Sequence, residues 1–357
     1  MKKRVLIAMS GGVDSSVAAY LLKESGYEAV GVTMCLGIGD SRDDDGTPRC
    51  CGSNAIADAR QVCAQLNMAH YVLDFSRELE RFVVDDFVAE YSAGRTPNPC
   101  IRCNEYLKFG KLLNYAKELR FDFLATGHYA KIDYSQKGYN LCRPKDRKKD
   151  QTYFLYRIKK ADLAAVLFPL ADYTKEEVRR IARQAQLAVA AKPQSQDICF
   201  IIGTDYKEFL VNKAGNVPGG DIVTTAGDIV GRHNGIINYT RGQRGGLGIA
   251  AKEPLYVIDI DAKNNRVIIG SKKEIPSNFV AVKMFNRLAD DFPAKSKAMI
   301  RYRHTPAACR IKILDNDKAE AVFDEPQEAV TPGQSIVFYN DDIVLGGGLI
   351  ETARMRR

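Results

Sequence analysis

A segment rich in glycine and serine, residues 10–16 (SGGVDSS), has the residue types of an anion-binding loop. It follows an apolar run that predicts a buried strand over residues 4–9 and precedes a helical pattern over residues 14–25. Glycines let the backbone approach an anion closely, serine hydroxyls donate hydrogen bonds, and a helix N-terminus adds free N–H groups. This context favours a phosphate-binding loop over an ordinary glycine turn capped by a serine. Asp14 has no direct use against a phosphate, so it would hold Mg²⁺ or the shape of the loop.

Cysteine side chains supply a second kind of chemistry. Cys100 and Cys103 lie in residues 94–104 (GRTPNPCIRCN), a loop with two prolines that runs into a predicted helix start, where the pKa of a thiol is lowered. Cys199 lies in a separate segment, SQDICF. Two thiols that meet at one site can transfer sulfur, because one holds a persulfide and the other releases its sulfur by forming a disulfide. The Cys100-x-x-Cys103 spacing is also typical of metal ligands, so three thiolates on an iron–sulfur cluster stay an alternative. The sequence lacks the second Cys-x-x-Cys pair that a closed four-cysteine zinc site needs.

The other cysteines do not indicate a disulfide scaffold, because the total of nine is odd and the chain is long. A lone cysteine is most often a small buried apolar residue, and we predict this role for Cys63, Cys142 and Cys309. The cysteines that stay unassigned are Cys35, Cys50 and Cys51.

The composition is that of an ordinary globular protein of 357 residues, with 45% hydrophobic and 27% charged residues. No apolar run approaches the roughly 18 residues that a membrane helix needs. The run that follows the N-terminal lysines is too short for a signal peptide. We therefore expect a cytoplasmic protein with no membrane partner.

Positive charge is unevenly distributed along the chain. The net charge is +8, and between residues 143 and 160 eight Lys and Arg stand against two Asp. Tyr153, Phe154 and Tyr156 are interleaved with these charges. A basic stretch with aromatic side chains suits a nucleic-acid backbone, although a charge run by itself is more often a solvated helix face.

Strands and helices alternate through the first half of the chain. Apolar runs predict strands at residues 4–9, 28–34, 70–74 and 123–126. Helical periodicity predicts helices at residues 14–25, 54–66, 77–91 and 105–119, and Thr174-x-x-Glu177 predicts a capped helix that ends near residue 184. This order indicates an α/β fold with a doubly wound parallel sheet. Ligands bind such sheets at the carboxyl ends of the strands, which brings together Ser10, Met34, Asp74 and Gly127.

Short strands dominate after about residue 199. Asn264-Asn265 between two apolar runs predicts a hairpin, and from residue 281 onward only strand-like runs separated by turn residues occur. This pattern predicts a small β-rich central domain and a closed or nearly closed C-terminal β-barrel. With boundaries near residue 203 and at Ile275-Pro276, the expected domains are residues 1–203, 204–275 and 276–357.

Residues 10–16 resemble the pyrophosphate loop of the ATP pyrophosphatases, enzymes with an adenine-nucleotide α-hydrolase-like fold that adenylate a carbonyl oxygen and release pyrophosphate. With the cysteine segments at residues 94–104 and 195–200, the chain resembles the bacterial tRNA-specific 2-thiouridylases over essentially its whole length. Other segments that match this family are ATGHYA (125–130), KKDQTYFL (148–155), GQR (242–244), RYR (301–303) and TPGQS (331–335). The resemblance implies 2-thiolation of the wobble uridine of tRNA, in which ATP with Mg²⁺ adenylates the uridine 2-oxygen and persulfide sulfur then displaces AMP.

The resemblance also assigns roles to residues of this chain. It implies that Cys103 is the nucleophile and that Cys199 carries the persulfide, with sulfur supplied by a cysteine desulfurase or a sulfur-relay protein. The residues implied in ATP binding are Ala8, Met9, Ser10, Gly11, Gly12, Val13, Asp14, Ser15, Met34 and Gly127. Those implied in tRNA binding are Asn98, Pro99 and Cys100 at the target base, and His128, Lys149, Asp150, Gln151, Arg301, Tyr302 and Gln334 elsewhere. Contacts from scattered loops suit a base that is splayed out of a single-stranded loop.

Cys100 departs from the family, in which many members have an aspartate that has been considered a general base. A thiol is a poorer general base unless its pKa is tuned, so base catalysis either falls elsewhere or is not essential. Three other functions stay open: an ATP-dependent ligase that uses ammonia, a thiolase that depends on an iron–sulfur cluster, and an RNA-binding protein without catalysis. The ligase gives the paired thiols no role, and the intact loop speaks against a protein without catalysis.

Overall fold

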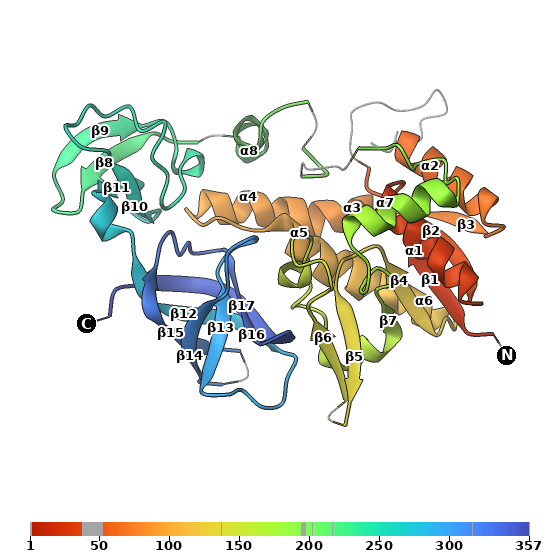
Figure 1. The fold of residues 1–357 in the computed structure, drawn as a ribbon. Coiled ribbons are helices and arrows are strands. Elements are labelled where there is room, and N and C mark those ends of the chain that lie inside the picture. The colour runs from red at the N-terminus through yellow and green to blue at the C-terminus, as the bar shows by residue number, and fades with distance from the viewer. Residues whose placement is uncertain are drawn as a thin grey trace. The chain divides into compact units, whose positions relative to one another are not determined.

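The structure, a computed structural model, describes residues 2–37, 53–136, 138–193, 198–201, 203–215, 217–315 and 317–356. The chain forms two compact units (Figure 1). The first comprises Met1–Val83, Cys100–Phe200 and Asp342–Val344, and the second comprises Val84–Pro99, Ile201–Asp341 and Leu345–Arg357. Among the helices of the described residues, none is long and apolar enough to cross a membrane.

A five-stranded sheet with the order β3-β2-β1-β4-β7 forms the centre of the first unit. Its strands are β1 (Arg4–Ala8), β2 (Glu28–Cys35), β3 (His70–Asp74), β4 (Phe123–Thr126) and β7 (Val166–Leu167). All neighbouring strands run parallel, which confirms the predicted sheet. Ala8 pairs with Val32 on one side and with Thr126 on the other, so the carboxyl ends of β1, β2 and β4 share one edge, as expected.

Three helices cover one face of this sheet. Val5 and Ile7 point to the same face of β1, and they pack with buried residues of α1 (Val13–Glu24), α2 (Ser53–Gln65) and α7 (Lys175–Gln184). The predicted capping box opens α7: the Thr174 hydroxyl accepts a hydrogen bond from Glu177 N at 3.2 Å, and the Glu177 carboxylate accepts one from Thr174 N at 2.6 Å. Because α1 and α7 pack against each other, the capped end of α7 lies near the segment that opens α1.

Two of the predicted helices are partly π-helical. Residues 76–92 run as α3 (Ser76–Leu79), the π-helix η1 (Glu80–Val84) and α4 (Asp85–Ser92). Residues 99–118 run as α5 (Pro99–Arg102), the π-helix η2 (Cys103–Leu112) and α6 (Leu113–Glu118). A π-helix has more residues per turn than an α-helix and is frequent at functional sites. The side chains that follow Cys103 therefore point in directions that an α-helical wheel does not predict.

The first unit also contains a hairpin that the sequence analysis did not predict. Its strands are β5 (Lys131–Ser135) and β6 (Gly138–Cys142), and Cys142 pairs with Ile343. Two short 3₁₀-helices follow, η3 (Thr152–Phe154) and η4 (Lys160–Ala165).

The second unit contains a small four-stranded sheet with the order β10-β11-β8-β9. Its strands are β8 (Gly220–Thr224), β9 (Ile229–His233), β10 (Tyr256–Asp261) and β11 (Arg266–Gly270). The predicted hairpin joins β10 and β11, and Asn265 in its turn has a φ of 51°. Besides α4, the described part of this unit contains the short helices α8 (Tyr206–Ala214), η5 (Ile236–Asn238) and η6 (Lys272–Glu274).

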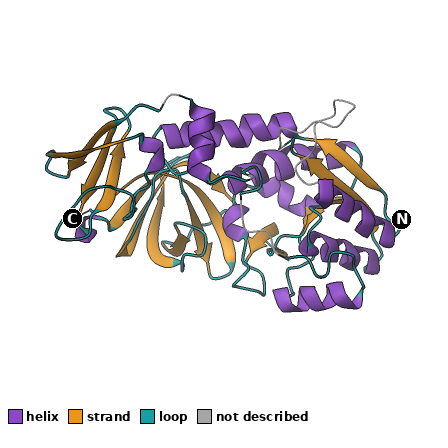
Figure 2. Ribbon diagram, turned by 90° about the horizontal axis from the view of Figure 1, so that it is seen from above, coloured by secondary structure: helices purple, strands orange, loops and turns teal. Residues whose placement is uncertain are grey.

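The predicted barrel is present and closed. Six strands follow one another in the order β12-β15-β14-β13-β16-β17, and β12 pairs with β17 to close the ring. These strands are β12 (Ser277–Arg287), β13 (Lys295–Met299), β14 (Ala307–Ile313), β15 (Ala319–Gln327), β16 (Ser335–Asn340) and β17 (Ile343–Arg354). The barrel strands appear in orange in Figure 2. Phe285, Phe323 and Phe338 fill the interior with β-branched residues around them, so the barrel is a packed core.

Candidate active site

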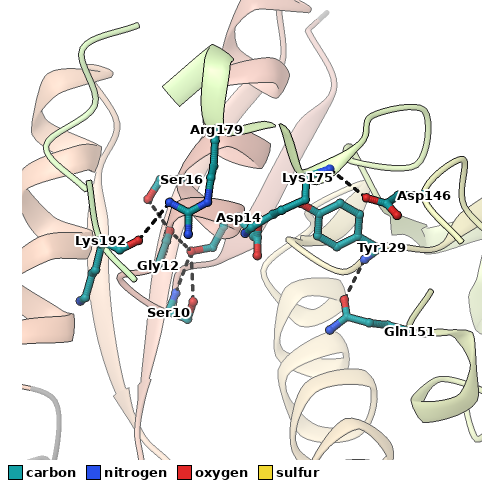
Figure 3. A network of polar contacts seen from close by, with 11 residues as sticks. Ser10, Gly12, Asp14, Ser16, Tyr129, Asp146, Gln151, Lys175, Arg179 and Lys192 are labelled. Atoms are coloured by element: carbon teal, nitrogen blue, oxygen red, sulfur yellow. Dashed lines mark hydrogen bonds and ion pairs between the residues drawn. The ribbon is translucent and has the colours of Figure 1, made fainter. Parts of the chain in front are cut away.

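The segment between β1 and α1 forms a closed loop held by its own serines (Figure 3). Ser10 N donates a hydrogen bond to Ser15 Oγ at 3.2 Å, and the hydroxyls of Ser15 and Ser16 both donate to Gly12 O, at 3.1 and 2.9 Å. Gly11 has a φ of +66°, and a Cβ there would lie 2.2 Å from the carbonyl oxygen of Ala55. The glycines therefore serve close packing and backbone conformation, and the loop leads directly into the N-terminus of α1.

Gly127 packs against this loop from the end of β4. A Cβ at Gly127 would lie 2.7 Å from Ser15 N and 2.8 Å from Asp14 C, which is closer than a Cβ approaches atoms to which it is not bonded. Met34 lies half-buried on β2, at the same edge of the sheet. The tertiary structure thus brings together the predicted nucleotide-binding residues of three strands.

Asp14 is tied to two side chains from other segments. Its Oδ1 accepts a hydrogen bond from the Tyr129 hydroxyl at 2.9 Å and forms an ion pair with Lys175 Nζ at 2.6 Å. Tyr129 N donates to Gln151 Oε1 at 2.8 Å, and Gln151 N donates to Tyr129 O at 3.0 Å. Burial, and after it the Asp14 carboxylate, raise the pKa of Tyr129, so its hydroxyl stays protonated and can donate.

Three cations near the loop were not singled out by the sequence analysis. Lys175 is the first residue of α7, and Arg179 of the same helix donates from its Nη1 to Lys192 O at 3.4 Å (Figure 3). Lys192 Nζ donates to Gly11 O at 3.0 Å and pairs with Asp58. The capping box at Thr174 located the start of α7, but only the packing of α7 on α1 places Lys175 at the loop.

Cys103, Cys100 and Cys199 are free thiols close enough to one another for their charges to interact. Cys103 is buried, whereas Cys100 and Cys199 are exposed to solvent. The thiol of Cys199 is nevertheless largely removed from water. This desolvation, and after it the neighbouring Cys103 and Cys100, raise its pKa to about 12. Desolvation also raises the pKa of Cys100.

Lys108 is the positive charge that acts on these thiols. It lowers the pKa of both Cys100 and Cys199 against the larger effect of desolvation. Its Nζ donates to Asn104 Oδ1 at 2.9 Å, and Asn104 Nδ2 donates to Phe154 O at 3.0 Å, so the cation has a fixed position. In an α-helix Lys108 would point well away from Cys103, five residues earlier, but in the π-helix η2 the two share nearly the same face.

The remaining described cysteines lie away from this chemistry. Cys63, Cys142 and Cys309 are buried and free, as predicted, and burial raises their pKa values to about 11, 11 and 12. Cys35 is disulfide-bonded, and Cys50 and Cys51 lie outside the described residues. Within the described ranges, no group of three His, Cys, Asp or Glu side chains could hold a metal ion.

Three family models together match nearly the whole chain. They are described as the tRNA methyl transferase HUP domain, which matches residues 3–203, the tRNA methyl transferase PRC-barrel domain (207–271) and the aminomethyltransferase beta-barrel domain (279–350). The tRNA-specific 2-thiouridylase MnmA 1 of Syntrophus aciditrophicus (strain SB) is 52% identical over 353 residues, 99% of this chain and 94% of that protein.

This chain belongs to the tRNA-specific 2-thiouridylase family. Its similarity to other named members is also high over the full length. The tRNA-specific 2-thiouridylase MnmA of Carboxydothermus hydrogenoformans is 47% identical over 359 residues, and that of Clostridium botulinum (strain Alaska E43 / Type E3) is 45% identical over 359 residues. In both comparisons the match covers 98% of this chain and 98% of the relative. The domain boundaries expected near residues 203 and 275 stay a prediction.

Several residues that the thiouridylase resemblance connects with tRNA have structural partners in the first unit. Asp150 is buried, and it accepts hydrogen bonds from Arg143 Nε at 2.6 Å and from Thr152 N at 2.9 Å. His128 Nδ1 lies 2.8 Å from Thr126 Oγ1, with Phe109 and Phe168 beside its ring. Desolvation and then Lys108 lower the pKa of His128 well below its usual range, so this imidazole is neutral at pH 7.

The basic stretch at residues 143–160 is not the aromatic-rich nucleic-acid surface that its sequence suggested. Tyr153 and Tyr156 are completely buried in the core and cannot stack on a base. Many of the positive side chains are paired with carboxylates. These pairs are Arg143–Asp150, Lys145–Glu177, Arg147–Asp342 and Arg157–Glu105. These pairs leave less positive charge for a polyanion than the sequence of this stretch predicts.

In the second unit, a turn of the barrel holds the segment that precedes Asn98 and Pro99. Gln334 Nε2 donates to Thr96 O at 2.9 Å and to Pro97 O at 3.3 Å, and Thr96 N donates to Pro332 O at 2.9 Å. Arg301 Nη1 donates to Glu328 O at 3.0 Å, so this exposed side chain is partly held in place. Tyr302, half-buried, lies under the guanidinium of Arg303.

Proposed function

We propose that this protein thiolates the 2-position of the wobble uridine of tRNA in an ATP-dependent reaction, and that it does so in the cytoplasm. The observation that carries the proposal is that an anion-binding loop and a pair of free thiols, Cys103 and Cys199, belong to one compact unit built on one parallel sheet. An ammonia-dependent ligase would leave the thiols without a role.

The first half of the proposed reaction is adenylation. The uridine 2-oxygen attacks the α-phosphorus of ATP, and the bond from that phosphorus to pyrophosphate breaks. The loop at residues 10–16 and the N-terminus of α1 bind the phosphates through backbone N–H groups, while the hydroxyls of Ser15 and Ser16 hold the loop in shape. One carboxylate together with substrate phosphates is a usual ligand set for Mg²⁺, and Asp14 supplies that carboxylate. When bound, the ion neutralises charge on the phosphates.

The second half is sulfur transfer. The terminal sulfur of a Cys199 persulfide attacks C2 of the adenylated uridine and AMP leaves, so the base is joined through two sulfurs to Cys199. The Cys103 thiolate then attacks the Sγ of Cys199, which releases 2-thiouridine and leaves a Cys103–Cys199 disulfide. A dithiol reductant must reopen this disulfide, and a cysteine desulfurase or a sulfur-relay protein must supply the next persulfide sulfur. Lys108 supports this step because its charge favours the anionic form of the sulfurs.

Of the residues expected at tRNA, some contact the tRNA directly in this proposal and others position the residues that do. Asn98, Pro99 and Cys100 face the target base, and Gln151 and Gln334 act as positioning residues for Tyr129 and for the backbone of residues 96–97. The side chains expected to touch tRNA directly elsewhere are those of His128, Lys149, Arg301 and Tyr302. Asp150 acts through Arg143 and Thr152, because its carboxylate is already occupied.

Anaerobic incubation with unmodified tRNA, Mg-ATP and a persulfide-generating donor, followed by mass spectrometry of the nucleosides, tests the proposal. Wild type and Cys142→Ala, a variant of a buried thiol outside the proposed pair, are expected to form 2-thiouridine. Cys103→Ala and Cys199→Ala are expected to form none. Product from both variants would refute the persulfide mechanism and favour free sulfide or a cluster. Release of pyrophosphate without any thiolated product from wild type would refute thiolation itself.

A further inference from the structure

Lys175 is an unusual lysine because its ammonium group is directed into the protein. Its side chain is only 11% exposed, and its Nζ lies 2.6 Å from Asp14 Oδ1 in the middle of the pyrophosphate loop. A lysine is seldom buried unless it is paired, because desolvation of the ammonium group is costly. The backbone also fixes this residue, since Lys175 N donates to Asp146 Oδ2 at 2.9 Å.

The surroundings of Lys175 hold its charge at the loop. Tyr129 donates its hydroxyl to the same Asp14 oxygen, and the ring of Tyr129 lies 6.0 Å from Lys175 Nζ, within the range of a cation–π contact. Gln151 fixes the backbone of Tyr129 on its other side. The ion pair with Asp14 and the contact with the Tyr129 ring thus both hold the ammonium group of Lys175 at the loop.

Several positive groups gather at the loop, where Asp14, Asp58 and Asp146 are their carboxylate partners. Arg179 lies one turn after Lys175 on α7, and its Nη1 donates to the carbonyl oxygen of Lys192, whose Nζ in turn donates to Gly11 O (Figure 3). The N-terminus of α1 adds further positive potential at the same place. Positive groups gathered in this way suit a polyanion with several phosphate groups, and of these cations Lys175 is the one whose ammonium lies against Asp14 of the loop.

We propose that Lys175 is a catalytic residue of the adenylation step, and that its ammonium contacts the pyrophosphate as it leaves, with Asp14 and Tyr129 as its positioning residues. The inference rests on the proposed function, which supplies ATP as the substrate. When the bond between the α-phosphorus and the bridging oxygen breaks, the electron pair stays on that oxygen. The ammonium of Lys175 stabilises this negative charge without giving up a proton.

A simpler role for Lys175 is to neutralise Asp14, and pyrophosphate binding without metal separates the two roles. Titration calorimetry with inorganic pyrophosphate in EDTA would compare wild type, Lys175→Met, Asp14→Asn and the double variant. If Lys175 contacts the anion, Asp14→Asn binds more tightly than wild type, and the double variant binds roughly 10- to 100-fold more weakly than wild type. If Lys175 only neutralises Asp14, the double variant has the net charge of wild type and binds equally well, which would overturn the proposal. The double variant leaves neither partner of the ion pair unpaired, so its result stands even if a single variant fails to fold. Thermal unfolding checks that each variant is folded.

Catalysis supplies the second readout. Pyrophosphate release in a single turnover is expected to slow roughly 10- to 100-fold in Lys175→Met and to recover in part in Lys175→Arg, which keeps the charge. Lys131→Met is the matched control, because Lys131 forms an exposed ion pair with Asp172 in the same unit, and it should keep the wild-type rate. Equal rates for Lys175→Met and wild type would also overturn the proposal. The two proposals can fail separately. If the wild-type protein makes no 2-thiouridine but the variants show the expected order of pyrophosphate affinities, the proposed function is refuted and the role of Lys175 stands.

Discussion

Gly127 gives the sharpest test of how the nucleotide-binding edge is packed. In Gly127→Ala the new methyl group would lie 2.7 Å from Ser15 N, 2.8 Å from Asp14 C and 2.9 Å from the Cα of Ser15. Ordinary van der Waals contacts of a Cβ are 3.4–4 Å, and all three neighbours are backbone atoms that no side-chain rotation can move. The strand end or the start of α1 must therefore shift by roughly half an ångström or more.

The size of the effect follows from this forced shift. Overpacking of this kind costs roughly 1–3 kcal/mol of stability. The displaced groups include the backbone N–H groups that we expect to bind phosphate, and loss of one or two such bonds weakens ATP binding by roughly 10- to 100-fold. Because φ at Gly127 is outside the left-handed region, the cost is one of space and not of backbone conformation.

Equilibrium dialysis with ATP and thermal unfolding would measure the two effects. Gly245→Ala is the matched control, since a Cβ there would meet nothing within 4 Å, and it should change neither quantity. Wild-type ATP affinity and wild-type unfolding temperature in Gly127→Ala would show that β4 does not pack on the loop as described.

Three further predictions concern the thiols and the tRNA-facing residues. A rise in the pKa of Cys199 from 9.0 to about 12 lowers the fraction of thiolate at pH 8 roughly 1000-fold. The more basic thiolate reacts about 20-fold faster, so the net rate of alkylation by iodoacetamide should be roughly 50-fold lower than in an unfolded peptide. Its rate should still rise tenfold per pH unit at pH 10, and a plateau below pH 9 would contradict this pKa. Asp150→Asn should lower the free energy of unfolding by roughly 1–3 kcal/mol without tRNA present, because Arg143 loses a charged partner, and an effect seen only with tRNA would argue for direct contact. Gln334→Ala should weaken tRNA binding several-fold in a filter-binding assay and leave ATP affinity unchanged, because it releases the backbone of residues 96–97; unchanged tRNA binding would contradict this positioning role.

The tertiary structure corrected the sequence-based view where burial decides the role of a residue. Tyr153 and Tyr156 follow a run of positive charges and look like stacking partners for bases, but both are buried in the core. A sequence shows which residue types alternate, and it does not show which of them face solvent when the segment lacks a regular helical or strand period. The segment around η3 has no such period, so its aromatic residues were assigned to the wrong environment.

The sequence by itself determined the elements whose signals are local. Residues 10–16, the capping box at Thr174, the Asn264-Asn265 hairpin and the alternation of strands and helices are each set by residues close together in the chain. Only the tertiary structure decided which distant charges meet. Lys175 reaches Asp14, 161 residues earlier in the chain, because α7 packs on α1. Such contacts arise from the packing of whole elements, whose energy depends on many residues at once, so no short motif contains them.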